Sequence, residues 1–137
     1  MGRIIAIDFG LKRTGLAVTD PLQIIGSPLV TIPTSSLLQW LKSYFEQEPV
    51  DRIVIGMPSR LDQSDTHITK DVIKLIQRLK ESFPDVPVTR IDERFTSKIA
   101  MQSMILGGMK KKDRKKKENV DKISAALILQ SYLETSK

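Results

Sequence analysis

Acidic side chains stand at points where the predicted elements of this 137-residue chain begin or end. Asp8 closes the apolar run Ile4 to Ile7, Asp92 and Glu93 follow a later apolar run, and Asp121 opens the last predicted helix. A carboxylate beside isoleucines is costly to bury, so it must lie where the strand leaves the core or hold a partner that offsets its desolvation. Asp8 is therefore the first candidate for a functional site.

These acids could converge on one divalent cation site. The carboxyl ends of neighbouring parallel strands face a common crevice, to which a helix terminus can bring a further group. Carboxylates in a chain with no cysteine and one histidine suit Mg²⁺ or Mn²⁺. Two such ions about 4 Å apart would activate a water and stabilise the leaving oxygen in phosphodiester hydrolysis.

Each acid also has a purely structural alternative. Asp121 favours the positive end of a helix dipole whether or not it binds a metal. Asp92 or Glu93 could instead pair with a neighbouring arginine on the surface. Adjacent residues of an extended segment point to opposite sides, so Asp92 and Glu93 are also alternatives to one another as ligands.

The net charge of +6 is concentrated in one segment, Lys110 to Lys117, which contains six lysines, one arginine and one aspartate. Gly107-Gly108 precede it and it contains no apolar residue, which predicts a mobile basic loop at about residues 108–118 that neutralises phosphates. A solvated charge run without a ligand is the alternative. The candidates for nucleic-acid contact in this segment are Lys110, Lys111, Lys112, Arg114, Lys115, Lys116 and Lys117.

Periodic apolar segments predict a single α/β domain over residues 1–137. Strands are expected at 3–8, 14–19, 28–32, 53–55 and 86–91, and helices at about 37–45, 68–79, 98–106 and 120–133. The first three strands follow one another through short connections and should be antiparallel. The last two flank helices and should run parallel to the first, which gives a mixed sheet covered by helices.

Several classes of protein are excluded by composition. The absence of cysteine removes disulfides, thiolate metal sites and cysteine nucleophiles. The first residues lack the zones of a signal peptide, and no apolar stretch approaches the roughly 20 residues needed to span a bilayer. The expectation is a cytoplasmic protein without a membrane partner.

Four motifs, in this order and across essentially the whole chain, resemble the YqgF/RuvX family: IAIDFGLKRTGLAVTD, VIGMP, IDERFTS and ENVDKISAALILQSYLE. The resemblance implies a ribonuclease H-like fold with a five-stranded mixed sheet in the order 3-2-1-4-5. It also implies a nuclease that processes the 5′ end of pre-16S rRNA and therefore meets ribosomal particles. An older assignment, by similarity to the RuvC resolvase, is cleavage of Holliday junctions, a form of branched DNA.

The resemblance also assigns roles to individual residues. Asp8, Glu93 and Asp121 match the three acids of the family motifs, which makes them the expected catalytic residues and ligands of Mg²⁺ or Mn²⁺. Glu93 is preferred over Asp92 as the ligand, with Asp92 in a supporting role. Further candidates for contact with phosphate are Lys12, Arg13, Arg94 and Thr96.

Two departures from the family pattern bear on activity. After VIGMP the family has an Asp-Gly pair, whereas this chain has Ser59 to Ser64 without a glycine. Resolvases of the RuvC type carry two acids about one turn apart on the last helix, whereas Ser124 stands three residues after Asp121. The second departure weakens the analogy with junction resolvases.

Two other classes of function are weighed against the nuclease. Asp8-Phe9-Gly10 with Gly15 matches the phosphate loop of actin and hexokinase type phosphotransferases, but those need two duplicated domains, and this chain has no repeat. A non-catalytic RNA-binding module is the other alternative, although acids without metal would only repel phosphate. A monomer would suit trimming of one strand and a homodimer a symmetric junction.

Overall fold

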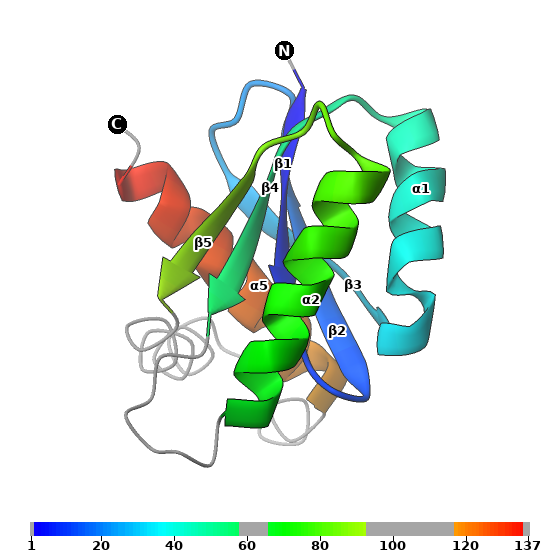
Figure 1. The fold of residues 1–137 in the computed structure, drawn as a ribbon. Coiled ribbons are helices and arrows are strands. Elements are labelled where there is room, and N and C mark those ends of the chain that lie inside the picture. The colour runs from blue at the N-terminus through cyan, green and yellow to red at the C-terminus, as the bar shows by residue number, and fades with distance from the viewer. Residues whose placement is uncertain (1, 58–65, 93–116, 136–137) are drawn as a thin grey trace.

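A five-stranded mixed sheet lies between helices on both faces in the computed structural model, which describes residues 2–57, 66–92 and 117–135 (Figure 1). The strands are β1 (Arg3–Asp8), β2 (Arg13–Thr19), β3 (Gly26–Pro33), β4 (Val50–Met57) and β5 (Val88–Asp92). The helices are α1 (Leu37–Gln47), which follows the 3₁₀ turn Thr34–Ser36, α2 (Thr66–Ser82) and α5 (Lys117–Thr135).

The strand order is β3-β2-β1-β4-β5, which confirms the predicted order 3-2-1-4-5. β1 pairs antiparallel with β2, and β2 pairs antiparallel with β3. On its other side β1 runs parallel to β4, which runs parallel to β5. β1 is thus the central strand, and its carboxyl end lies at the same edge of the sheet as those of β4 and β5.

The two faces of the sheet have separate cores. Ile5 and Ile7 of β1 point into the core shared with α1 and α2, whereas Ile4 and Ala6 point into the core shared with α5. A strand that is covered on both faces needs apolar residues at every position, which explains the uninterrupted run before Asp8. The run ends where the strand leaves the core, as its composition predicted.

Most element boundaries differ from expectation by one to three residues. β3 covers residues 26–33 rather than 28–32, and α5 begins at Lys117 rather than near residue 120. The expected boundary of α5 was set by its first apolar residue, but lysine and glutamate favour helices and extend it. Asp121 therefore lies in the second turn of α5 and not in the first. The helix expected at 98–106 falls outside the described residues.

Within the part of the chain that the structure describes, no helix is both long enough and apolar enough to cross a membrane.

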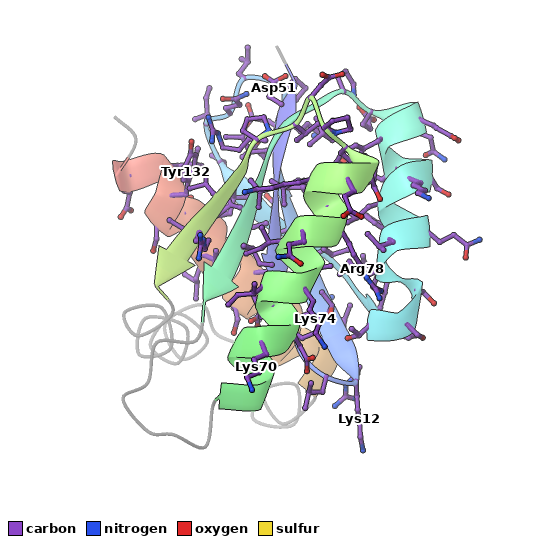
Figure 2. The ribbon with its side chains drawn as sticks, viewed as in Figure 1. Lys12, Asp51, Lys70, Lys74, Arg78 and Tyr132 are labelled. Atoms are coloured by element: carbon purple, nitrogen blue, oxygen red, sulfur yellow. The ribbon has the colours of Figure 1, made fainter. Side chains whose placement is uncertain are left out.

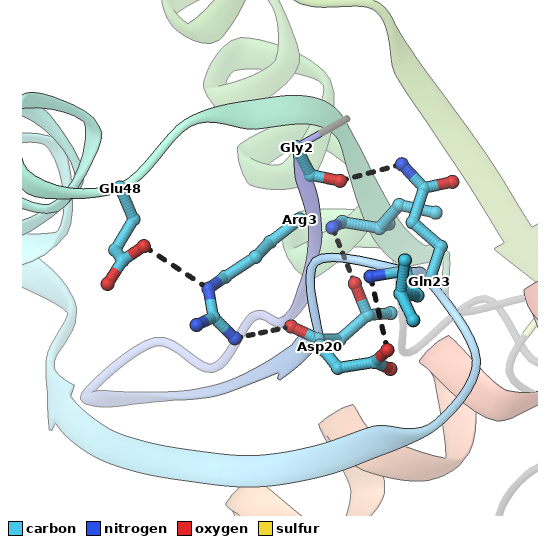
Figure 3. Close-up of polar contacts among 8 residues, drawn as sticks. Gly2, Arg3, Asp20, Gln23 and Glu48 are labelled. Carbon is cyan, nitrogen blue, oxygen red and sulfur yellow. Dashed lines mark hydrogen bonds and ion pairs between the residues drawn. The ribbon is translucent and has the colours of Figure 1, made fainter.

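The amino edge of the sheet, opposite the carboxyl end of β1, is closed by polar contacts (Figure 3). The Arg3 guanidinium donates to the Thr19 carbonyl at 2.9 Å and pairs with Glu48 at 3.4 Å. Gln23, at a φ of 59°, donates from its side-chain amide to the Gly2 carbonyl at 2.7 Å. Because these polar groups form hydrogen bonds and an ion pair with one another, they stabilise the fold at this edge.

Asp20 organises the loop between β2 and β3 at the same edge. Its carboxylate accepts hydrogen bonds from the backbone N–H groups of Ile25 and Ile24 at 2.9 Å and of Leu22 at 3.1 Å. These donors, that of Ile25 foremost, hold the pKa of Asp20 below its ordinary value. The carboxylate therefore serves the loop and has no part in the candidate active site.

Candidate active site

The carboxyl edge of the sheet gathers the ends of three parallel strands. Asp8 is the last residue of β1, Met57 the last of β4 and Asp92 the last of β5. Ile7 lies beside Ile55 in the β1–β4 pair, and Met57 lies beside Asp92 in the β4–β5 pair. Asp8 and Asp92 thus end strands on either side of β4, as the sequence predicted from their positions after apolar runs.

Helix α5 runs antiparallel to β1, so that its first turns approach this edge. Leu129, in its second half, packs against Gly26 at the start of β3. The ring of Tyr132 lies 5.7 Å from the guanidinium carbon of Arg52, near the start of β4. Because both contacts lie toward the amino edge, the opposite end of α5, which carries Asp121, lies toward the carboxyl edge (Figure 1).

Asp8 and the hairpin that follows it carry the described polar groups at this edge. Asp8 is half-buried and lies beside Gly15 of β2. Lys12 is exposed in the connection between the two strands, and Arg13 is half-buried as the first residue of β2. Both cations belong to the hairpin that follows Asp8 and lie within five residues of it in the sequence.

Two threonines fix this hairpin to the start of α1. The hydroxyl of Thr34 donates to the Gly10 carbonyl at 2.6 Å, so the 2.8 Å contact with Thr14 must have Thr14 as the donor. The N–H of Thr34 also donates to the Lys12 carbonyl at 3.0 Å. Thr14 is fully buried, so its hydroxyl depends on Thr34.

Replacing Thr34 with valine is expected to destabilise the fold by about 1–3 kcal/mol, because it leaves the buried Thr14 hydroxyl and the Gly10 carbonyl without this partner. Urea unfolding measures the change. Ser35→Ala, at the exposed neighbouring residue, is the control and should stay within about 0.5 kcal/mol of wild type. Equal stabilities for Thr34→Val and Ser35→Ala would contradict a role for this hydroxyl network.

Several predicted site residues lie outside the described residues: Glu93, Arg94, Thr96, Lys110, Lys111, Lys112, Arg114, Lys115 and Lys116. Lys117 is the first residue of α5, and Asp121 is placed by its backbone alone. Among the described side chains, no three His, Asp or Glu residues gather into a group that could hold a metal ion. The structure therefore places at one edge the end of β1, which carries Asp8, and the end of β5, and directs toward this edge the first turns of α5, which carry Asp121. Of the three acids, the side chain that the structure describes is that of Asp8.

Sequence reasoning missed the contribution of α2 to this edge. Lys74 and Arg78 line an open groove together with Phe9 and Leu11 of the hairpin. The available signal was the spacing of four residues between Lys70, Lys74 and Arg78, which places them along one side of a helix. The apolar residues that predict α2 lie on its other face and do not indicate this row of cations.

Comparisons with known proteins agree with this geometry. The chain matches the family described as "RuvX: Holliday junction resolvase" over residues 2–135. A protein of Phocaeicola vulgatus is 50% identical over 137 residues, which is 100% of this chain and 99% of that protein. A protein of Bacteroides fragilis is 49% identical with the same coverage, and both are named "Putative pre-16S rRNA nuclease".

Solved structures share the fold at low sequence identity. RuvC of T. thermophilus, in complex with a Holliday junction substrate, has a TM-score of 0.63 at 12% identity and covers 99% of this chain and 97% of its own. A second Thermus thermophilus RuvC structure has a TM-score of 0.59 at 13% identity, with 98% and 96% covered.

A mixed sheet in the order β3-β2-β1-β4-β5, with helices on both faces, is the ribonuclease H-like fold. This confirms the fold expected from the sequence motifs. The chain belongs to the RuvX family, as the match over residues 2–135 and the identities near 50% establish.

Proposed function

We propose that this chain is a metal-dependent nuclease that hydrolyses phosphodiester bonds at the 5′ end of pre-16S rRNA, on ribosomal particles in the cytoplasm. The observation that carries the proposal is the position of Asp8 at the end of the central strand, at the edge where β4 and β5 end and toward which α5 begins. Relatives that are 50% and 49% identical to the chain are named for this RNA, which supports the choice of substrate.

The donor set fits a hard divalent cation. Asp8 offers a half-buried carboxylate, and the chain has no cysteine that would favour a softer metal. Asp8, Glu93 and Asp121 are the residues that would hold one or two Mg²⁺ or Mn²⁺ ions. When bound, the cation supplies an activated water and charge neutralisation at the scissile phosphate.

The cations of the chain would bind the phosphates of the substrate. Lys12 and Arg13, on the hairpin after Asp8, would contact phosphates and hold the strand against the carboxylates. Arg94 and Thr96, next to Glu93 in sequence, are assigned the same role. Without such contacts the acids at this edge would repel a nucleic acid, so both kinds of residue are needed.

The basic segment Lys110 to Lys117 supplies affinity in this proposal. Replacing its seven cations with glutamine should weaken RNA binding. It should also lower the slope of log K against log salt by up to about 5, because each phosphate contact on a single strand contributes about 0.7. Fluorescence anisotropy of a labelled RNA at several salt concentrations measures this slope. An unchanged slope would remove the segment from the binding surface.

Cleavage of Holliday junctions is the second candidate, because the family description names it. Ser124, three residues after Asp121, gives the last helix no second acid one turn away, which favours the RNA substrate. The two candidates also differ in assembly: a monomer suits trimming of one strand, and a two-fold dimer suits a symmetric junction.

One assay tests the proposal. The protein is incubated with a labelled pre-16S rRNA fragment and with a synthetic four-way DNA junction, in Mg²⁺, in Mn²⁺ and in EDTA. Cleavage of the RNA that EDTA abolishes is the expected result. Cleavage of the junction alone would favour the second candidate, and salt-sensitive RNA binding without cleavage of either would favour a binding module.

A further inference from the structure

An open groove lies at the carboxyl edge of the sheet, on the face that carries α1 and α2. Its volume is about 510 Å³, and three elements contribute its walls: the hairpin after β1, the start of α1 and one side of α2. Residues that line it include Phe9, Leu11, Leu37, Leu38, Lys74 and Arg78. Because Phe9 follows Asp8 in the chain, the groove and the candidate active site lie at the same edge of the sheet, on its two opposite faces.

A row of cations runs along the α2 wall (Figure 2). Lys70, Lys74 and Arg78 are exposed and spaced by four residues, so they lie along one side of the helix. At 1.5 Å per residue the row is about 12 Å long, which is enough to contact more than one phosphate of a strand.

No ion pair between described residues neutralises Lys70, Lys74 or Arg78. The ion pair found among the described residues joins Arg3 to Glu48 at the opposite edge of the sheet. Asp71 is the acid that lines the groove, against the two cations Lys74 and Arg78 on the same wall. The groove therefore has an excess of positive charge, which is complementary to a phosphate backbone.

The floor of the groove is apolar and includes an aromatic ring. Phe9 is half-buried there, and the side chain of Leu11 is 62% exposed at the rim. Unpaired bases bind proteins by stacking on such side chains while cations follow the backbone. A duplex keeps its bases stacked inside, so it cannot place them against this floor and should not bind in the groove.

We propose that this groove binds a single-stranded stretch of the nucleic acid substrate, with its phosphates along Lys70, Lys74 and Arg78 and its bases against Phe9 and Leu11. The proposal rests on the nuclease function proposed above and extends it. It assigns to α2 the task of holding one strand at the edge of the sheet where β1 ends, so that the substrate must be unpaired in the part that lies in the groove.

Single substitutions along α2 test the proposal. Lys74→Gln and Arg78→Gln should each weaken binding of a labelled oligouridylate and each lower the salt slope by about 0.7. Lys80→Gln is the matched control, since this exposed lysine lies on the other side of the same helix and its loss changes the net charge equally. Anisotropy in EDTA separates binding from cleavage, and thermal unfolding verifies that the variants fold.

The outcomes separate this proposal from the nuclease function. Losses for Lys74→Gln and Arg78→Gln, none for Lys80→Gln and none on a duplex RNA of the same length would support it. Wild-type binding by both variants, with RNA cleavage by the wild-type protein intact, would overturn the groove and leave the nuclease standing. Equal losses for all three variants, or losses only on the duplex, would also overturn it. A wild-type protein that neither binds nor cleaves RNA would overturn the proposed function itself.

Discussion

Replacing Asp8 with asparagine is expected to abolish RNA cleavage and to leave RNA binding intact. Asparagine keeps the size of the side chain but lacks the negative charge that attracts a divalent cation. A metal ion stabilises the transition state by several kcal/mol, and about 1.4 kcal/mol is a factor of ten in rate, so the rate should fall at least about 10²-fold. Binding should be equal or tighter, since a charge that repels phosphate is removed.

The control for this experiment is Asp85→Asn. Asp85 is exposed in the connection from α2 to β5, at the amino edge of the sheet, so the same chemical change occurs far from Asp8. Cleavage rates are compared in Mg²⁺ and in Mn²⁺, and urea unfolding of both variants is compared with that of wild type. A folded Asp8→Asn variant that cleaves at the wild-type rate would refute the assignment of Asp8.

The helices and strands were predictable because each has its own apolar pattern within a short stretch of the sequence. Ile4 to Ile7 form an uninterrupted apolar run, as a strand covered on both faces requires. The resemblance of the motifs supplied the sheet order, which no local pattern contains. The boundaries of the helices and strands were harder to predict. Helix α5 begins at Lys117 because charged residues extend a helix without changing its apolar pattern.

The candidate site was predictable in part. Asp8 was identified because an acid after four apolar residues has few structural uses, and the strand ends place it where expected. The groove along α2 was not predicted, because Lys70, Lys74 and Arg78 look like an ordinary solvated face until the hairpin is known to lie opposite them. The same applies to Gln23, whose bonds to Gly2 and Asp51 join residues far apart in the sequence.

The position of α5 relative to Asp8 is expected to matter as much as the acids themselves. Ala6 of β1 and Ala17 of β2 lie side by side, both fully buried, beneath Ala125 and Leu129 of α5. Small residues at these positions let the helix approach the sheet. Ala17→Leu should therefore displace α5, and with it Asp121, at a cost of about 1–3 kcal/mol in stability.

Cleavage by the folded Ala17→Leu protein should fall by about 10²-fold, since a displacement of about 1 Å between reacting groups has an effect of that size. Leu41→Ala is the control: this fully buried leucine packs in the other core, so it should cost about 2–5 kcal/mol but leave α5 in place. Under conditions in which both variants are folded, Leu41→Ala should retain the cleavage activity that Ala17→Leu loses. This is expected even though Leu41→Ala should be as unstable as Ala17→Leu or less stable. If Ala17→Leu is folded and cleaves normally, α5 does not position a catalytic group, and Asp121 has to be removed from the site.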